Sequence, residues 1–328
     1  MPTERPIAVI IAAFNAQETI AKSVRSALDC PEVGEVVVVD DASSDRTAFM
    51  AGVAGAGDSR FKVLVQECNR GPSAARNRAI RESNSPIIAM LDADDLFLPG
   101  RFGPLLVTDD WDLIADNIVF FSNYREIVPF QTTKSQGPHP VCTLSFEDFV
   151  LANVPKRDVR RGELGFLKPL IRRSFLTRHQ LSYPEDCRLG EDFILYTEAL
   201  SRDGRFKLVL SGGYAGLIRP NSLSAQHQAE DLRALLRQER RLLENLNLTS
   251  QQKAALSVHA RSTQRRLRYR EVLQKRQRKG MLSGGFAALK QPTSILDWWY
   301  DYSSPAQPAA FSTPRMLLSP QDFERYAQ

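Results

Sequence analysis

The first hundred residues alternate between short, β-branched apolar runs and segments with helical spacing. The apolar runs lie at residues 7–14, 36–39, 61–65 and 87–91. Such runs suit strands that are covered on both faces, as in a parallel sheet. The segments between them place apolar residues on one helical face, as in 20–28. Strands alternating with helices predict a doubly wound, mostly parallel α/β sheet with right-handed crossovers.

This topology also predicts where a ligand binds, because ligands of such sheets lie beyond the carboxyl ends of the strands. The residues at these ends are mostly polar, acidic, basic or aromatic, although the strands before them are apolar. They are Ala13, Phe14 and Asn15, then Asp40 and Asp41, then Asn69, Arg70 and Gly71, and finally Asp92, Asp94 and Asp95. The sequence therefore predicts a single site along this edge.

Three carboxylates follow the fourth apolar run, in the stretch AMLDADDLFLPG. Like charges so close together repel, and a buried carboxylate is unfavourable unless it is paired or bound to a cation. Mg²⁺ and Mn²⁺ take oxygen ligands and are often held by one or two carboxylates plus substrate phosphates. Asp92, Asp94 and Asp95 thus suit a divalent ion that bridges the protein to a diphosphate, although an isolated DxD pattern also occurs in surface turns.

The composition is that of a folded protein, with 43% hydrophobic and 25% charged residues in a chain of 328. The four cysteines lie far apart without CxxC spacing, which argues against a zinc site or a disulfide framework and favours a reducing cytosol. No apolar run is long enough for a signal segment or a membrane span. We therefore expect a cytoplasmic protein whose contact with a membrane, if it has one, is peripheral and at the inner face.

Five motifs resemble, in order and spacing, those of the inverting family-two glycosyltransferases of GT-A fold. They are VIIAAFNAQETIAKSVRSAL, VVVVDDASSDRT, NRGPSAARNRAI, IIAMLDADDLFLPGR and LGEDFILYTEAL. Within that family the chain is most similar to bacterial enzymes that extend lipid-linked repeat units of exopolysaccharide, including succinoglycan-type glucosyltransferases. The resemblance implies a GT-A catalytic domain over residues 1–225. Residues 226–328 would then form a basic helical extension and a tail rich in Pro and aromatic residues.

The resemblance also implies which residues bind the nucleotide. Phe14 would stack on the uracil ring, unless it is simply a core residue, and the backbone at Ala13 would read the edge of the base. Asp41 would accept the N–H of the base, and Arg76 would reach the nucleotide. Asp92, the first Asp of the DxD motif, is expected near the ribose.

The reaction implied for this family needs a metal ion and a base. Asp94 would bind Mn²⁺ or Mg²⁺, and Asp95 would be either a second ligand or a loop cap. An inverting transfer needs one carboxylate to take the proton of the acceptor hydroxyl, because the metal stabilises the leaving group. Asp192 resembles that base, and Glu191 would orient the acceptor or hold Asp192. Alternatively, both carboxylates only favour the N-terminus of their helix.

Basic residues raise two further questions. Lys168 and its neighbours Arg172 and Arg173 either face a phosphate or are simply solvated, and the resemblance implies that Arg219, Ser222 and Ser224 close over the diphosphate. Residues 231–279 hold 14 Arg and Lys against 4 Asp and Glu, in a chain whose net charge is +5. Nucleic acid is not expected, because there is no RNA-binding motif and few aromatic residues interleave. Either an anionic membrane surface or packing on the catalytic domain accounts for this segment.

Together these features predict transfer of a hexose such as glucose from a UDP-sugar to a saccharide acceptor. The acceptor is expected to be linked to polyprenyl diphosphate, in the synthesis of exopolysaccharide or another surface glycan. One alternative is a nucleotidyltransferase, but the first strand end, AAFNAQET, lacks the glycines of a phosphate loop. Another is an inactive saccharide- or nucleotide-binding scaffold on the same fold.

Overall fold

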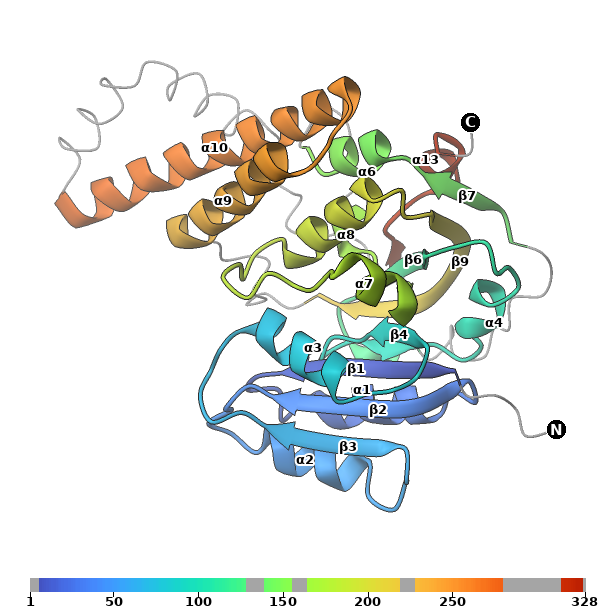
Figure 1. Cartoon of the computed structure of the whole chain (residues 1–328). Coiled ribbons are helices and arrows are strands. Elements are labelled where there is room, and N and C mark those ends of the chain that lie inside the picture. Colours follow the sequence, from blue (N-terminus) through green and yellow to red (C-terminus); the bar gives the residue numbers. More distant parts are fainter. Residues whose placement is uncertain (1–5, 128–138, 155–163, 219–227, 280–313, 327–328) are drawn as a thin grey trace.

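A mixed sheet of ten strands forms the centre of the molecule (Figure 1). The computed structural model describes residues 6–127, 139–154, 164–218, 228–279 and 314–326. The strands are β1 (Ile7–Ala13), β2 (Val33–Asp40), β3 (Phe61–Val65), β4 (Ile87–Met90), β5 (Leu96–Phe97), β6 (Leu113–Phe121), β7 (Val141–Leu144), β8 (Leu170–Arg172), β9 (Phe206–Leu217) and β10 (Arg315–Met316). Their order is β3-β2-β1-β4-β8-β6-β9-β5, with β10 paired to β6 and β7 paired to β9.

The first four strands are parallel, as the alternating sequence pattern predicts. Their crossovers run through α1 (Ile20–Leu28), α2 (Thr47–Ala54) and α3 (Pro72–Arg81). Figure 1 shows α3 in front of β1 and β2, and α1 behind them. Strands β1 and β4 consist of apolar residues and are almost entirely buried, as expected for strands that are covered on both faces. The predicted α/β fold is therefore confirmed.

The second half of the sheet is mixed because β8 runs antiparallel between β4 and β6. Its helical elements are α4 (Phe102–Leu105), η1 (Tyr124–Ile127), α6 (Phe146–Ala152), η2 (Leu164–Phe166), α7 (Arg173–His179) and α8 (Glu191–Ser201). The stretch RFKLVLSGGYAGLIRPNSLSAQ suggests a pair of strands, but its described part forms one strand, β9, which continues through Gly212 and Gly213. A Cβ atom on Gly213 would lie 2.7 Å from the Cα atom of Arg101. The glycine therefore permits a close approach of Arg101 instead of forming a turn.

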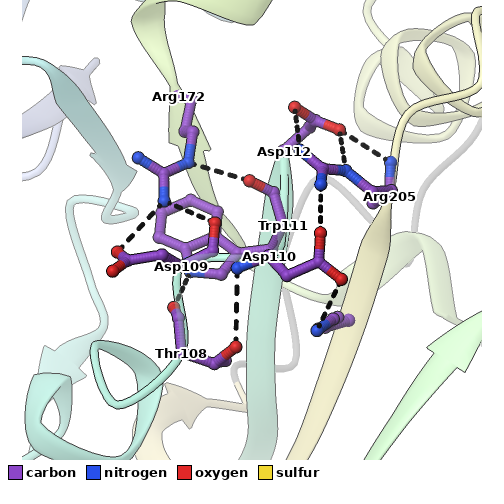
Figure 2. A network of polar contacts seen from close by, with 8 residues as sticks. Thr108, Asp109, Asp110, Trp111, Asp112, Arg172 and Arg205 are labelled. Carbon is purple, nitrogen blue, oxygen red and sulfur yellow. Dashed lines mark hydrogen bonds and ion pairs between the residues drawn. The ribbon is translucent and has the colours of Figure 1, made fainter.

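A cluster of ion pairs lies at the amino ends of β6 and β9 (Figure 2). Asp112, just before β6, accepts hydrogen bonds from the backbone and the guanidinium of Arg205, just before β9. Arg205 also pairs with Asp110. Arg172, at the end of β8, donates to the carbonyl oxygen of Trp111 at 2.8 Å. These bonds join the ends of three neighbouring strands, at the edge of the sheet opposite the carboxyl ends of β1, β2 and β4.

The basic segment forms two helices, α9 (Ala229–Asn245) and α10 (Ser250–Lys279), which lie side by side and project from the sheet (Figure 1). Leucines recur at helical spacing in α9, and Leu232, Leu235, Leu236 and Leu242 among them are buried. Packing within the protein thus accounts for these leucines. None of the helices in the segments that the structure describes is long and apolar enough to cross a bilayer.

The last described segment of the chain returns to the central sheet. Strand β10 pairs antiparallel with β6, and Leu317, Leu318 and Phe323 join the main core, the last from α13 (Pro320–Glu324). The side-chain amide of Asn117 in β6 donates a hydrogen bond to the carbonyl oxygen of Leu318 at 2.7 Å, and its oxygen accepts one from the N–H of Leu318 at 3.0 Å. A domain boundary at residue 225 stays a prediction, but this last described segment packs with the central sheet.

Candidate active site

The turns that follow β1 and β2 are locked together. The backbone N–H of Asn15 donates to the hydroxyl of Ser43 at 2.9 Å, and the N–H of Ser44 donates to the side-chain oxygen of Asn15 at 2.9 Å. Asn15 and Ala42 both have positive φ angles, 48° and 57°, a conformation that is unusual outside glycine and often found at functional sites. Phe14 is 50% exposed at this turn and is therefore not a core residue.

Asp41 lies beside the turn of Phe14, and its own N–H donates to the carbonyl oxygen of Ala13 at 2.8 Å. Its buried carboxylate accepts hydrogen bonds from the N–H groups of Arg70 and Gly71, at 2.8 and 2.7 Å, and from the amide of Gln66. Asp41 thus organises the loop that leads into α3. Its predicted contact with the base is untested, but the structure places it with Ala13 and Phe14 at one edge of the sheet.

Arg76 projects from α3 toward two carboxylates that come from distant parts of the sequence. Its guanidinium contacts Asp92 at 2.9 Å and Glu191 at 2.7 Å, and it lies over the ring of Tyr183. Burial disfavours the charge of Arg76, but the surrounding carboxylates outweigh burial and raise its pKa. The next residue, Asn77, holds the backbone of Tyr183 at both its oxygen and its nitrogen. Helix α3 therefore fixes one wall of the site.

Lys168, which precedes β8, lies between the carboxylates of Asp92 and Asp192. Its ammonium is 2.7 Å from Asp192 Oδ2 and 3.1 Å from Asp92 Oδ2. Together with Arg76 and Glu191 these residues form a chain of five alternating charges, in the order Glu191, Arg76, Asp92, Lys168, Asp192. Burial raises the pKa of Asp92, but Lys168 and Arg76 outweigh burial and hold that pKa well below its usual range.

Asp94 and Asp95 occupy different environments just after Asp92. Asp94 is partly exposed, whereas Asp95 is buried. The Asp95 carboxylate accepts hydrogen bonds from the Tyr214 hydroxyl at 2.7 Å and from the N–H of Leu217 at 2.8 Å. Burial and the neighbouring carboxylates of Asp94 and Asp92 raise the pKa of Asp95 well above its ordinary value. These contacts favour the loop-cap alternative for Asp95, whose metal role stays untested.

The donor set fits a divalent ion that is bound partly by its substrate. In the described ranges, no three or more His, Cys, Asp or Glu side chains come together as a metal cage. Asp92 is already paired with two cations and Asp95 is hydrogen-bonded on both oxygens. Asp94 is a hard oxygen ligand at the partly exposed tip of the loop, and Mg²⁺ often combines one carboxylate with substrate phosphates.

Glu191 and Asp192 begin helix α8, as the GED motif predicts. The preceding Gly190 has a φ angle of 73° and packs closely against Leu235 of α9. The helix dipole favours both carboxylates, but each also contacts a cation from another element, as described above. Burial raises the pKa of Glu191, and Asp192 adds to this effect, whereas Arg76 opposes it. A role at the helix N-terminus alone therefore does not account for their contacts.

Sequence reasoning left the role of Lys168 open and overlooked the residues that hold it. Arg101, at the start of α4, donates to the carbonyl oxygen of Lys168 at 2.6 Å and forms a buried ion pair with Asp116 of β6. The signal for Lys168 was a single lysine inside the apolar stretch GFLKPLI. Arg101 and Asp116 lie 15 residues apart and carry no such signal. Arg219, Ser222 and Ser224 lie outside the described residues.

The sheet, the DxD loop and the acidic start of α8 define a glycosyltransferase of GT-A type, and the comparisons with known proteins agree. The model of the family Glycosyl transferase family 2 matches residues 8–137. The succinoglycan biosynthesis protein ExoU of Rhizobium meliloti (strain 1021) is 44% identical over 294 residues, which cover 90% of this chain and 85% of that protein. The chain therefore belongs to glycosyl transferase family 2.

Solved structures share the fold at much lower sequence identity. S. aureus TarS 1-349 in complex with UDP-GlcNAc has a TM-score of 0.59 at 18% identity, covering 89% of this chain and 79% of that one. The mannosyltransferase PcManGT from Pyrobaculum calidifontis, in complex with GDP-Man and Mn2+, has a TM-score of 0.54 at 16% identity, covering 94% and 83%. These likenesses show the fold, and the prediction that the chain is a glycosyltransferase is confirmed by the family.

Proposed function

We propose that this glycosyltransferase transfers a hexose from a UDP-sugar to a saccharide acceptor, with inversion at the anomeric carbon. The observation that carries the proposal is the position of Asp192, joined through Lys168 to Asp92 of the DxD motif. The carboxylate that we propose as the base and the carboxylate that we propose for the donor site thus contact the same ammonium group. A relative named for succinoglycan biosynthesis supports a role in making exopolysaccharide or another surface glycan, on a lipid-linked acceptor.

In this proposal the donor lies along the carboxyl ends of β1, β2 and β4. The exposed ring of Phe14 stacks on the uracil, with Ala13 and Asp41 at its edge, and Asp92 lies near the ribose. Arg76 reaches the nucleotide. Asp94 holds Mg²⁺ or Mn²⁺, which when bound stabilises the negative charge of the leaving diphosphate.

The proposed reaction is an in-line displacement. The acceptor hydroxyl attacks the anomeric carbon, and Asp192 takes the hydroxyl proton as the new C–O bond forms. The bond from the anomeric carbon to the diphosphate oxygen breaks, and its electron pair leaves with UDP. Glu191 orients the acceptor or holds Asp192. Inversion follows because the acceptor attacks from the face opposite the diphosphate.

We also propose that the enzyme works at the anionic inner face of the membrane, where a polyprenyl-linked acceptor would lie. Because the leucines of α9 are buried, attachment would depend on charge and not on insertion of an apolar face. Each basic residue near an anionic surface contributes about 1 kcal/mol. Among the residues of α9 and α10 up to 274, the exposed arginines are Arg237, Arg240, Arg241, Arg261 and Arg270, called the hairpin arginines below.

The variant Asp192→Asn tests the proposed base. A base acts on the acceptor, so transfer or donor hydrolysis should fall by about 10²- to 10⁴-fold, whereas binding of UDP with Mn²⁺ should stay unchanged. The assay offers UDP-glucose, UDP-galactose and UDP-GlcNAc with Mn²⁺ and measures released UDP. Asp203→Asn, at an exposed position after the same helix, is the matched control.

Two results would contradict the proposal. A fully active Asp192→Asn enzyme, even one that is slightly less stable, would show that Asp192 is not the base. A wild-type protein that binds UDP with Mn²⁺ but turns over none of the nucleotide sugars would instead favour the scaffold alternative.

A further inference from the structure

We propose that Lys168 is a positioning residue that holds the carboxylate of Asp192 at a fixed position relative to the donor site. This inference rests on the proposed function, in which Asp192 is the base. Lys168 would fix one oxygen of Asp192 and leave the other to receive the proton of the attacking hydroxyl.

The contacts of Lys168 set it apart from a solvated lysine. The residue is 7% exposed, and its ammonium contacts carboxylates from two different elements, Asp92 after β4 and Asp192 at the start of α8. An ammonium has three donors in a compact group, so it can serve both carboxylates at once. The carboxylates of Asp192 and Asp92 more than offset burial, which by itself lowers the pKa of Lys168, and raise that pKa above its ordinary value.

The backbone of Lys168 is also fixed. Its carbonyl oxygen accepts a hydrogen bond of 2.6 Å from Arg101, whose guanidinium is locked by the carboxylate of Asp116. Pro169 follows and restricts the conformation of Lys168 itself. A flexible side chain is thus attached to a rigid point, so the ammonium has a defined place between the two carboxylates.

The two oxygens of Asp192 differ in how firmly they are held. Oδ2 lies 2.7 Å from Lys168, whereas Oδ1 has a contact of 3.4 Å from the hydroxyl of Tyr196. Such a long contact is a weak hydrogen bond. Oδ1 is therefore the oxygen that can accept a proton from an attacking hydroxyl without breaking the ion pair.

The balance of charges around Lys168 also supports a positioning role. Asp92, Glu191 and Asp192 carry three negative charges around two cations, and Arg76 alone balances only one of them. Carboxylates in such a largely buried cluster repel each other and would move apart without a second cation. Removing the Lys168 ammonium should therefore let Asp192 turn away from the donor, and a displacement of 1 Å can reduce a rate by about 10²-fold.

A double-mutant cycle tests whether Lys168 acts through Asp192. The variants are Lys168→Met, Asp192→Asn and the combination, assayed by UDP release from the nucleotide sugar that the wild type hydrolyses fastest, with Mn²⁺. We expect Lys168→Met to lower kcat by about 10- to 100-fold while the Kd for UDP with Mn²⁺ changes less than about threefold. In the Asp192→Asn background the same change should have almost no further effect, because residues that act as a unit are not additive.

Controls separate this inference from a merely structural role. Lys62→Met removes a lysine that pairs with Glu82 on the surface, and it should leave kcat unchanged. Lys168→Gln keeps a hydrogen-bond donor for Asp192 and replaces the Met variant if that variant does not fold. The decrease in kcat that Lys168→Gln causes should likewise disappear in the Asp192→Asn background.

Three results would overturn the inference. Losses that multiply in the double variant would mean that Lys168 acts independently of Asp192. A Kd for UDP weakened tenfold or more, with kcat intact, would make Lys168 a donor-binding residue. A lower Tm with normal kcat and Kd would make it structural. Full activity of Asp192→Asn itself would count against the base, and so against the proposed function.

Discussion

Replacing Arg101 by Met should destabilise the enzyme strongly, although Arg101 does not touch the proposed reacting groups. The side chains of Arg101 and Asp116 are 0% and 1% exposed. Arg101 donates to Asp116 through Nε and Nη2, and its guanidinium packs over the rings of Phe97 and Tyr214. Methionine keeps much of this packing but leaves the Asp116 carboxylate buried without its cation.

The magnitude follows from the environment of Asp116. Removing one partner of a buried ion pair reduces the free energy of unfolding by about 3 to 5 kcal/mol, because the other charge remains uncompensated. The carbonyl oxygen of Lys168 also loses its donor, which contributes about 1 kcal/mol. In a thermal scan we expect Tm to fall by about 6 °C or more.

A second change should recover part of this loss. Asp116→Asn removes the buried charge and still offers an oxygen to the N–H of Gly213, which now donates to Asp116 at 2.8 Å. The double variant Arg101→Met, Asp116→Asn should therefore be about 2 kcal/mol more stable than Arg101→Met alone. Thermal unfolding of the wild type, both single variants and the double variant measures this. A double variant as unstable as the sum of its single variants would refute the reasoning.

Three further predictions concern the donor site and the membrane. Phe14→Ala should weaken UDP binding by about 1 to 3 kcal/mol, the range for an aromatic ring stacked on a base, whereas Phe49→Ala, at a similarly exposed ring, should not; equal affinities would remove the stacking role. Asp94→Asn should abolish the dependence of UDP binding on Mn²⁺ in calorimetry, and an unchanged dependence would exclude Asp94 as the metal ligand. Changing the hairpin arginines to Gln should release the protein from anionic vesicles, and added salt should release the wild type. Vesicle binding that neither the substitutions nor salt weakens would contradict the proposal of attachment by charge.

The parallel half of the fold was predictable because its signals are local. Strands β1 and β4 are continuous apolar runs, β2 contains the apolar run 36–39, and β3 is apolar except for Lys62. Polar residues that mark the edge of the sheet follow these strands. The second half was harder to predict because its pairings depend on residues that are distant in sequence. The two glycines in β9 suggest a turn, and only the nearby Arg101 explains why the strand continues.

The site shows the same division. Asp92, Asp94 and Glu191 lie in motifs with recognisable spacing, and the structure brings Asp92 and Glu191 together through Arg76. The contacts of Lys168 depend on the orientation of β8, which runs antiparallel between β4 and β6. No local pattern specifies that orientation. Sequence reasoning could therefore identify the acidic groups, but not how their charges are balanced.

The pairing of β10 with β6 has a consequence for how the protein is made. Ribosomes add about 5 to 20 residues per second, so Arg315 appears roughly 5 to 20 s after the end of β9. During that interval the growing chain holds β6 without its last partner, and Leu317, Leu318 and Phe323 have yet to cover the core. An unpaired strand edge beside exposed apolar surface invites aggregation. The nascent enzyme should therefore depend most on chaperones during the interval before residues 315–323 are made.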